Sequence, residues 1–417
     1  MNRDTRRAPA PLPAPSGQAG APGMRSALAA LCVTELTSWG ILYYSFPVAL
    51  TALTRDTGWS ATAAMGAFSA GLLTSVVAGP LVGRLLDRHG PHRVMTCGSF
   101  LGILALLAVA AAPRLSWFIA AWMLVGLAQS MLLYAPAFAA LTRWYGPDRI
   151  RPLTTVSLVA GLSSTVYAPL TAFLLAQLGW RTTYVVLAVV LGVVTLPLHL
   201  FCLTPPWPPA PPRTPSQTPP RTREVTSSRA FWLLAAAMGL ASLGLYAATT
   251  NLVPLLISRG IGTTTAATAL GLCGAGQLLG RLGYPALTRR TSPRARTAVV
   301  LATGAVAVAA LASIPGPVLL LIAATVAAGA VRGTFTLLQA TAVSDRWGLH
   351  RFATRNALAT TPAAFAIALA PATGALLAGQ VGSYSGAFWL LAGVALIGAA
   401  LAMGTTAGLH DHFTQGP

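Results

Sequence analysis

Long apolar stretches, each about as long as a lipid bilayer is thick, recur along this sequence and constrain its fold more than any other feature. A helix needs about 20 apolar residues to cross a hydrocarbon core of ~30 Å. Twelve stretches meet this criterion, over residues 26–52, 61–83, 93–112, 116–141, 153–177, 182–203, 231–257, 264–287, 297–313, 317–342, 354–379 and 385–407. The sequence therefore predicts an all-α polytopic membrane protein with twelve transmembrane helices.

Composition excludes the soluble alternatives. Charged residues make up 8% of the 417, against roughly a quarter in soluble domains, and the mean hydropathy is +0.67. The net charge of +19 does not indicate a nucleic-acid partner, because the arginines are scattered through short loops and form no single basic face. The four cysteines lie in apolar stretches without CxxC spacing (Cys32, Cys97, Cys202, Cys273). We therefore expect no disulfide framework, no metal and no other cofactor.

Arginine placement predicts the orientation. If the N-terminus is cytoplasmic, 22 arginines fall on the cytoplasmic side and four lie outside (Arg55, Arg114, Arg181, Arg259). Cytoplasmic loops carry such an excess of positive charge, so both termini should be cytoplasmic. Every basic residue is an arginine and the chain is rich in alanine, a bias that suggests a GC-rich bacterial genome. We expect a multi-pass protein of a bacterial inner membrane.

A proline-rich stretch divides the spans into two sets of six. Residues 204–229 contain nine prolines and should form an extended, semi-rigid cytoplasmic linker. The predicted organisation is a disordered N-terminal tail (1–25), a six-helix bundle (26–203), the linker (204–229), a second six-helix bundle (230–408) and a C-terminal tail (409–417).

The two halves resemble each other in sequence. "GPLVGRL" at 79–85 recurs as "GQLLGRL" at 276–282, "TRWYG" at 142–146 as "DRWG" at 345–348, and "APLTAFLLA" at 168–176 as "APATGALLA" at 370–378. The matches keep the same order at offsets of about 200 residues, which indicates a duplicated six-helix unit. Two such repeats around a midplane cavity are typical of secondary transporters.

The segment after the second span, "GRLLDRHGPHR" at 83–93, combines glycines at a predicted turn with an acid among bases. Asp87 could pair with a basic residue or accept hydrogen bonds from a helix N-terminus and so latch the cytoplasmic side. The segment resembles the signature loop of the major facilitator superfamily, G-x-x-x-D-[RK]-x-G-x-[RK]-[RK]. The matching residues are Gly83, Asp87, Arg88, Gly90 and Arg93, and His92 replaces the first of the paired bases.

This resemblance implies an alternating-access carrier, not an enzyme, with the matching loop residues in the cytoplasmic gate. The second-half copy keeps Gly280 and Arg281 but has Pro285 and no acid. Two departures weaken the alternative of a drug or secondary-metabolite exporter. Trp122 precedes Gly126 where such exporters carry an arginine, and "GLSSTVYAPL" at 161–170 matches their glycine-proline motif poorly. The stretches "ELTSWGILYYSFPVAL" and "RGTFTLLQATAVSDRWG" further resemble the bacterial monocarboxylate-porter-like branch.

Two ionisable residues interrupt the apolar spans. Glu35 lies in the first span and Arg332 in the tenth, and each costs about 2.5–3.5 kcal/mol at a helix centre. At 1.5 Å per residue both should lie at similar depths, roughly 13–15 Å from the cytoplasmic ends of their spans. The resemblance places both spans around the central cavity. At an offset of 203 residues, Arg332 corresponds to Gln129.

Two interpretations of this pair remain open. In the first, Arg332 binds a small organic anion, Glu35 carries a proton, and protonation of Glu35 frees Arg332 for the anion. In the second, the two form a fixed ion pair, which at 4 Å and an effective dielectric constant near 20 gains about 4 kcal/mol. The candidate cavity lining comprises Glu35, Tyr43, Tyr44, Gln129, Tyr134, Tyr246, Asn251, Arg332 and Gln339. We expect a monomer whose partners are the substrate, protons and lipid.

Overall fold

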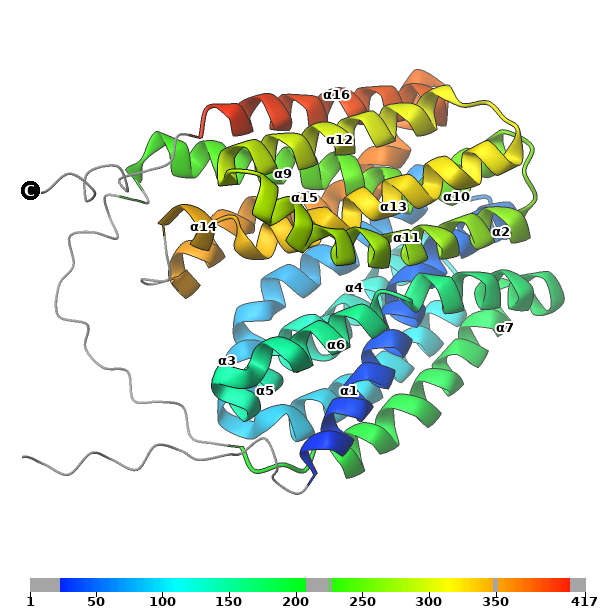
Figure 1. The fold of residues 1–417 in the computed structure, drawn as a ribbon. Helices are drawn as coiled ribbons and strands as arrows, with labels where there is room; N and C mark the ends of the chain where they lie inside the picture. The colour runs from blue at the N-terminus through cyan, green and yellow to red at the C-terminus, as the bar shows by residue number, and fades with distance from the viewer. Residues whose placement is uncertain (1–22, 208–224, 226, 348–351, 406–417) are drawn as a thin grey trace, which may run out of the picture.

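The computed structural model describes residues 23–207, 225, 227–347 and 352–405, in which helices form two bundles (Figure 1). The predicted tails and most of the predicted linker lie outside these residues. The first half contains α1 (Met24–Trp39), η2 (Gly40–Tyr44), α2 (Ser45–Thr57), α3 (Ala61–Ala110), α4 (Leu115–Leu132), α5 (Tyr134–Tyr145), η3 (Gly146–Arg149), α6 (Ile150–Ala160) and α7 (Ser163–Cys202). The second contains α9 (Arg229–Thr250), α10 (Leu252–Ser258), α11 (Thr263–Arg290), α12 (Pro293–Ser313), α13 (Val318–Thr341), α14 (Ser344–Trp347), α15 (Phe352–Val381) and α16 (Tyr384–Met403).

Two of the helical segments are too long for one crossing. Within the described residues, nine segments are long and apolar enough to span a membrane, and two of these measure 50 and 53 residues. Gly90 in α3 and Gly179 in α7 leave the helical conformation at φ 74° and 70°, so each long segment turns back on itself. With α11, a helix of 28 residues outside the nine, the described helices are consistent with the twelve predicted crossings.

The turn at 83–93 differs from the prediction in one respect. We expected glycines at both ends of this loop to turn the chain, but Gly83 lies inside the continuous helix α3. Gly90 alone has the left-handed φ that favours a residue without Cβ. The loop is therefore almost entirely helical, with a single hinge.

Prolines interrupt the first and seventh spans at corresponding places. Pro47 cannot donate a backbone hydrogen bond to the residue four positions earlier, and the preceding segment Gly40–Tyr44 winds as a π-helix. In the second half, α9 ends before Asn251 and α10 begins at Leu252, two residues before Pro254. Both interruptions are buried within the bundle, where freed backbone groups can bind side chains.

The halves meet along α3 with α15 and along α7 with α11. Four hydrogen bonds cross this boundary in the described residues; their pairs are Thr62–Ala375, Ser69–Ala372, Thr165–Gly271 and Ser157–Arg281. One end of the molecule holds most arginines; this arginine-rich face includes Arg25, Arg84, Arg88, Arg93, Arg143, Arg149, Arg151, Arg289, Arg290 and Arg294. The α2–α10 contact between the halves lies at the opposite face, to the right in Figure 1.

The same close helix approach occurs in both halves. A Cβ added to Gly126 of α4 would stand 1.8 Å from the backbone oxygen of Gly71, and one added to Gly329 of α13 would stand 2.0 Å from that of Cys273. Gly126 and Gly329 are 203 residues apart. Small residues allow such backbone contact between membrane helices, so the duplication seen in sequence is also present in the packing.

Candidate functional site

Arg332 lies on α13 in the middle of the molecule, surrounded by aromatic rings. Its residue is 4% exposed, and its guanidinium carbon lies 4.3 Å from the ring centre of Tyr246 and 6.0 Å from that of Tyr44. Tyr43 is a third neighbour. Nε and Nη1 are buried without a hydrogen-bond partner. Stacking on aromatic faces partly offsets the cost of burying the cation but leaves these two donors unsatisfied.

No acid among the described residues forms an ion pair with Arg332. The described residues form three ion pairs, Asp87–Arg143, Asp56–Arg181 and Asp345–Arg296, and none involves Glu35 or Arg332. The fixed Glu35–Arg332 pair that we considered is therefore absent from this conformation. The equal depth predicted for the two residues does not imply a contact, because depth says nothing about which way each helix turns its side chain.

Glu35 occupies a separate place in the first half. The residue is 0% exposed, and both carboxyl oxygens lack a hydrogen-bond partner. Trp39, one turn further along α1, is the polar group beside the carboxyl, and the ring of Tyr134 lies 4.9 Å from that of Trp39. Protonation of Glu35 cannot free Arg332 by breaking a direct contact here, so that step of the predicted mechanism does not apply to this conformation.

Arg281 is a second buried cation, which the arginine count placed on the cytoplasmic side. It lies within α11, in agreement with the predicted span 264–287, and is 8% exposed. Its Nη1 donates to the backbone oxygen of Ser157 in the other half, while Nε has no partner. Tyr134 lies near both Arg281 and Glu35, whose charges act on its hydroxyl. Tyr134 thus lies close to a cation of one half and an acid of the other.

The three predicted amide side chains bind protein groups. Gln129 Nε2 donates to the Leu42 oxygen in the π-helical segment at 2.7 Å. Asn251 Nδ2 donates to Ala247 O at 2.9 Å and to Pro371 O at 3.3 Å, which fastens the break in the seventh span to α15. Gln339 Nε2 donates to Ser242 Oγ at 3.1 Å. Gln129 and Asn251 stabilise helix interruptions, and Gln339 joins α13 to α9.

The predicted gating loop forms one ion pair. Asp87 Oδ1 lies 3.5 Å from Arg143 Nη1 at the end of α5, so Asp87 pairs within its own half. Arg88 and Arg93 are exposed and pair with no acid in the described part of the chain. In this conformation the loop does not connect the two halves through a charge.

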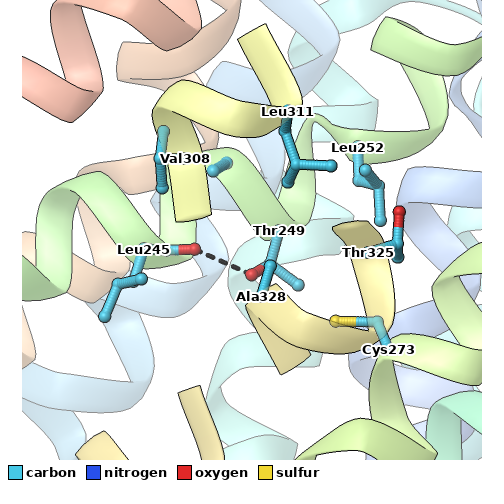
Figure 2. A pocket seen from close by; sticks show the side chains of 9 residues that line it. Leu245, Thr249, Leu252, Cys273, Val308, Leu311, Thr325 and Ala328 are labelled. Carbon is cyan, nitrogen blue, oxygen red and sulfur yellow. Dashed lines mark hydrogen bonds between the residues drawn. The ribbon is translucent and has the colours of Figure 1, made fainter. Parts of the chain in front are cut away.

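A small apolar cavity lies within the second half, next to Cys273 (Figure 2). Thr325 and Ala328, which line it, lie one to two helical turns before Arg332 on α13. It encloses about 10 Å³, at the lower limit for one water molecule, and is lined by residues of α9 to α13. Thr249 and Thr325 donate their hydroxyls to carbonyls of their own helices. The cavity is too small and too apolar to be the substrate site.

Comparisons with known proteins agree with this architecture. The sequence model of the Major Facilitator Superfamily matches residues 31–347. Human monocarboxylate transporter 11 is 28% identical over 235 residues, which cover 55% of this chain and 47% of the relative. The chain thus spans about half the length of that curated relative.

Solved structures resemble the whole bundle. A nucleoside transporter, NupG, has a TM-score of 0.72 at 13% identity and covers 91% of this chain and 98% of its own. A bacterial homolog of the human lysosomal transporter Spinster, in an inward-facing and unoccupied conformation, has a TM-score of 0.67 at 15% identity, with coverage of 92% and 94%. At these identities the similarity establishes the fold alone.

Proposed function

The chain belongs to the Major Facilitator Superfamily, a family of transporters, and we propose that it carries a small organic anion, a monocarboxylate, together with a proton. Alternating access would expose the space between the two bundles to each side of the membrane in turn. The proposal places the arginine-rich face in the cytoplasm of a bacterium, with the protein acting as a monomer in the inner membrane.

The observation that carries this proposal is the uncompensated charge of Arg332. A buried cation without an acid leaves donors and charge unsatisfied, and the described residues offer Arg332 aromatic faces instead of an anion. A carboxylate from solution would supply both the opposite charge and the acceptors, since a guanidinium binds carboxylates with paired hydrogen bonds. Tyr43, Tyr44 and Tyr246 would surround the bound anion.

Arg281 supports the same class of substrate. Its Nε has no partner and its charge lies at the boundary between the halves, as does that of Arg332 beside Tyr44. Two buried cations near tyrosines of the first half make the region between the bundles positive. Such a region attracts anions and repels the amphipathic cations that many exporters carry.

Glu35 is the proposed proton carrier. A fully buried carboxyl without an ion-pair partner is costly as an anion and is accommodated more readily as the neutral acid. The proton on Glu35 and the negative charge of the substrate would then cross together with no net charge. Tyr134, which lies near Glu35 and Arg281, would link the two charged groups between the halves.

Uptake by proteoliposomes tests the proposal. Purified protein should accumulate radiolabelled lactate or a related short-chain monocarboxylate when the outside is acidic. R332A should reduce the rate at least about tenfold, the loss of one charged hydrogen bond, and R332K should retain part of it. R55A, which removes an exposed arginine at the opposite face, is the matched control. Export of an amphipathic dye by R332A, without monocarboxylate uptake by the wild type, would support the exporter alternative instead.

The proton role has its own variant. E35Q keeps the shape of the side chain but cannot release a proton, so uptake should lose its acceleration by external acid while exchange of labelled for unlabelled substrate continues. Acid-stimulated uptake that persists in E35Q would remove Glu35 from the mechanism without affecting the assignment of Arg332.

A further inference from the structure

Trp207, at the start of the proline-rich stretch that joins the two halves, contacts the gating loop and its ion pair. Its Nε1 donates to the backbone oxygen of Asp87 at 3.1 Å. The guanidinium carbon of Arg143 lies 4.3 Å from its ring centre, and the Trp144 ring lies 6.3 Å away in an edge-on arrangement. The indole therefore contacts the loop through one hydrogen bond and α5 through two aromatic contacts.

The hinge of the loop is shaped to accept this indole. A Cβ at Gly90 would lie 3.1 Å from Cγ of Trp207, so most side chains at this position would collide with the ring. Gly90 also has the left-handed φ of 74°, which a glycine adopts without strain. Trp207 further packs against the small apolar cluster of Val82, Leu86 and Val94. Backbone conformation and packing thus require the same glycine.

Arg143 is shared between two partners. The Asp87 carboxylate lies 3.5 Å from Nη1 of Arg143, which is too far for a strong hydrogen bond. The indole of Trp207 covers the guanidinium of Arg143. The side chain of Arg143 is 14% exposed, whereas that of Asp87 is 67% exposed. An ion pair this exposed is weak by itself, so the stacked indole supplies much of what holds Arg143 in place.

The cluster lies where the halves must move. α3 packs against α15 across the boundary, and its hydrogen bonds to α15 are made by Thr62 and Ser69 near the start of α3. Asp87 lies further along α3, at the arginine-rich face. The contacts of Asp87, Arg143 and Trp207 described above are all made within the first half. Closing the arginine-rich face would bring the second half towards Asp87, and this carboxylate could then exchange Arg143 for a partner across the boundary.

We propose that Trp207 is a positioning residue of the gate: it holds Asp87 and Arg143 together in the present conformation and so opposes closure of the arginine-rich face. The described start of the segment that connects the halves thereby acts on the gating loop. The proposal does not depend on which substrate is carried.

Distance measurements between spin labels test this role. The labels replace Arg151 of α6 and Arg290 of α11, which are exposed on different halves at the arginine-rich face, in a full-length protein whose four cysteines have been removed. Double electron–electron resonance in lipid nanodiscs then reports how far apart the halves stand. The variants are W207A, W207F and, as a matched control, W389A, whose tryptophan on α16 is 55% exposed.

W207A should raise the ratio of short to long distances by about two- to fivefold, the change expected in an equilibrium constant when a cation–π contact is lost. W207F retains a ring over Arg143 but not the hydrogen bond to Asp87, and should give a smaller shift. W389A should leave the distribution unchanged. Equal distributions in W207A and wild type, or the same shift in W389A, would overturn the proposal. Because no substrate is needed, failure here would leave the anion proposal standing.

Discussion

Each half has an ion pair of its own at the arginine-rich face, and the two pairs differ in exposure. In the first half Asp87 of α3 pairs with Arg143, and the two side chains are 67% and 14% exposed. In the second half Asp345 of α14 pairs with Arg296 at the start of α12, and the side chains are 26% and 3% exposed. One acid comes from the gating loop and the other from the end of the tenth span.

Arginines at corresponding positions in the two halves make different contacts. Arg346 is 203 residues after Arg143, yet it is 6% exposed and donates to the Pro293 oxygen and the Thr297 hydroxyl. The second-half copy of the gating loop has no acid, and the structure shows that Asp345 supplies one from a neighbouring span. We infer that the buried ion pair of the second half is permanent, whereas the exposed ion pair of the first half can break and re-form.

Breaking the buried pair should have the largest effect on stability. D345N leaves Arg296 buried without its partner, and such a change typically costs about 3–5 kcal/mol. We expect a clear fall in the thermal unfolding temperature of the detergent-solubilised protein. If the unfolding temperature of D345N falls no further than that of D87N, the distinction between a permanent and a releasable ion pair is contradicted.

The opposite face offers an intermediate test of the same comparison. Arg259 donates to Ile314 O at 2.6 Å, and to Leu311 O, Ala312 O and Ser385 Oγ, whereas Arg181 binds the exposed Asp56 and Ala112 O. R259A should destabilise the protein by about 2–3 kcal/mol, the usual loss for hydrogen bonds to a charged group.

R181A serves as the control for R259A, because a surface ion pair contributes about 0–1 kcal/mol. Thermal unfolding of the two variants should therefore separate clearly. Equal unfolding temperatures would show that the contacts of Arg259 stabilise the second half no more than those of Arg181 stabilise the first half at this face.

The smallest change in stability is expected for D87N. The exposed pair contributes about 0–1 kcal/mol, so the unfolding temperature should hardly move. The spin-label distances between residues 151 and 290 should shift less than in W207A, because Asp87 pairs with Arg143 in the present conformation and with a partner across the boundary after closure, so D87N weakens both conformations. Unchanged distances in D87N, with W207A also unchanged, would show that this cluster does not control the gate.

The sequence predicted those features of the site that depend on single helices. Arg332 could be placed at the membrane centre because a permanent charge in a long apolar run is costly, and the fold class followed from span length. The interruptions near Pro47 and Pro254 follow from the backbone donor that proline lacks. These inferences need only the helical rise and the solvent.

What the sequence could not predict depends on how helices face one another. Glu35 and Arg332 have the same predicted depth in the membrane but form no ion pair with each other. Span boundaries predict depth but not the rotation of each helix about its axis. Arg281 was counted with the cytoplasmic arginines, although the predicted span 264–287 contains it. Its nine-residue distance from the end of α11, about 13 Å by helical rise, indicates a place inside the bundle. Trp207 reaches Asp87 only through tertiary packing.

Ligand-induced thermal stabilisation tests the central claim most directly. A ligand that binds the folded state raises its unfolding temperature, by an amount that grows with the logarithm of the ligand concentration relative to Kd. A series of short-chain carboxylates should therefore stabilise the wild type and the R55A control. R332Q, which retains hydrogen-bond donors but removes the charge, should show no such stabilisation at the same concentrations. Equal carboxylate-dependent shifts in R332Q and wild type would contradict the claim that Arg332 binds the transported anion.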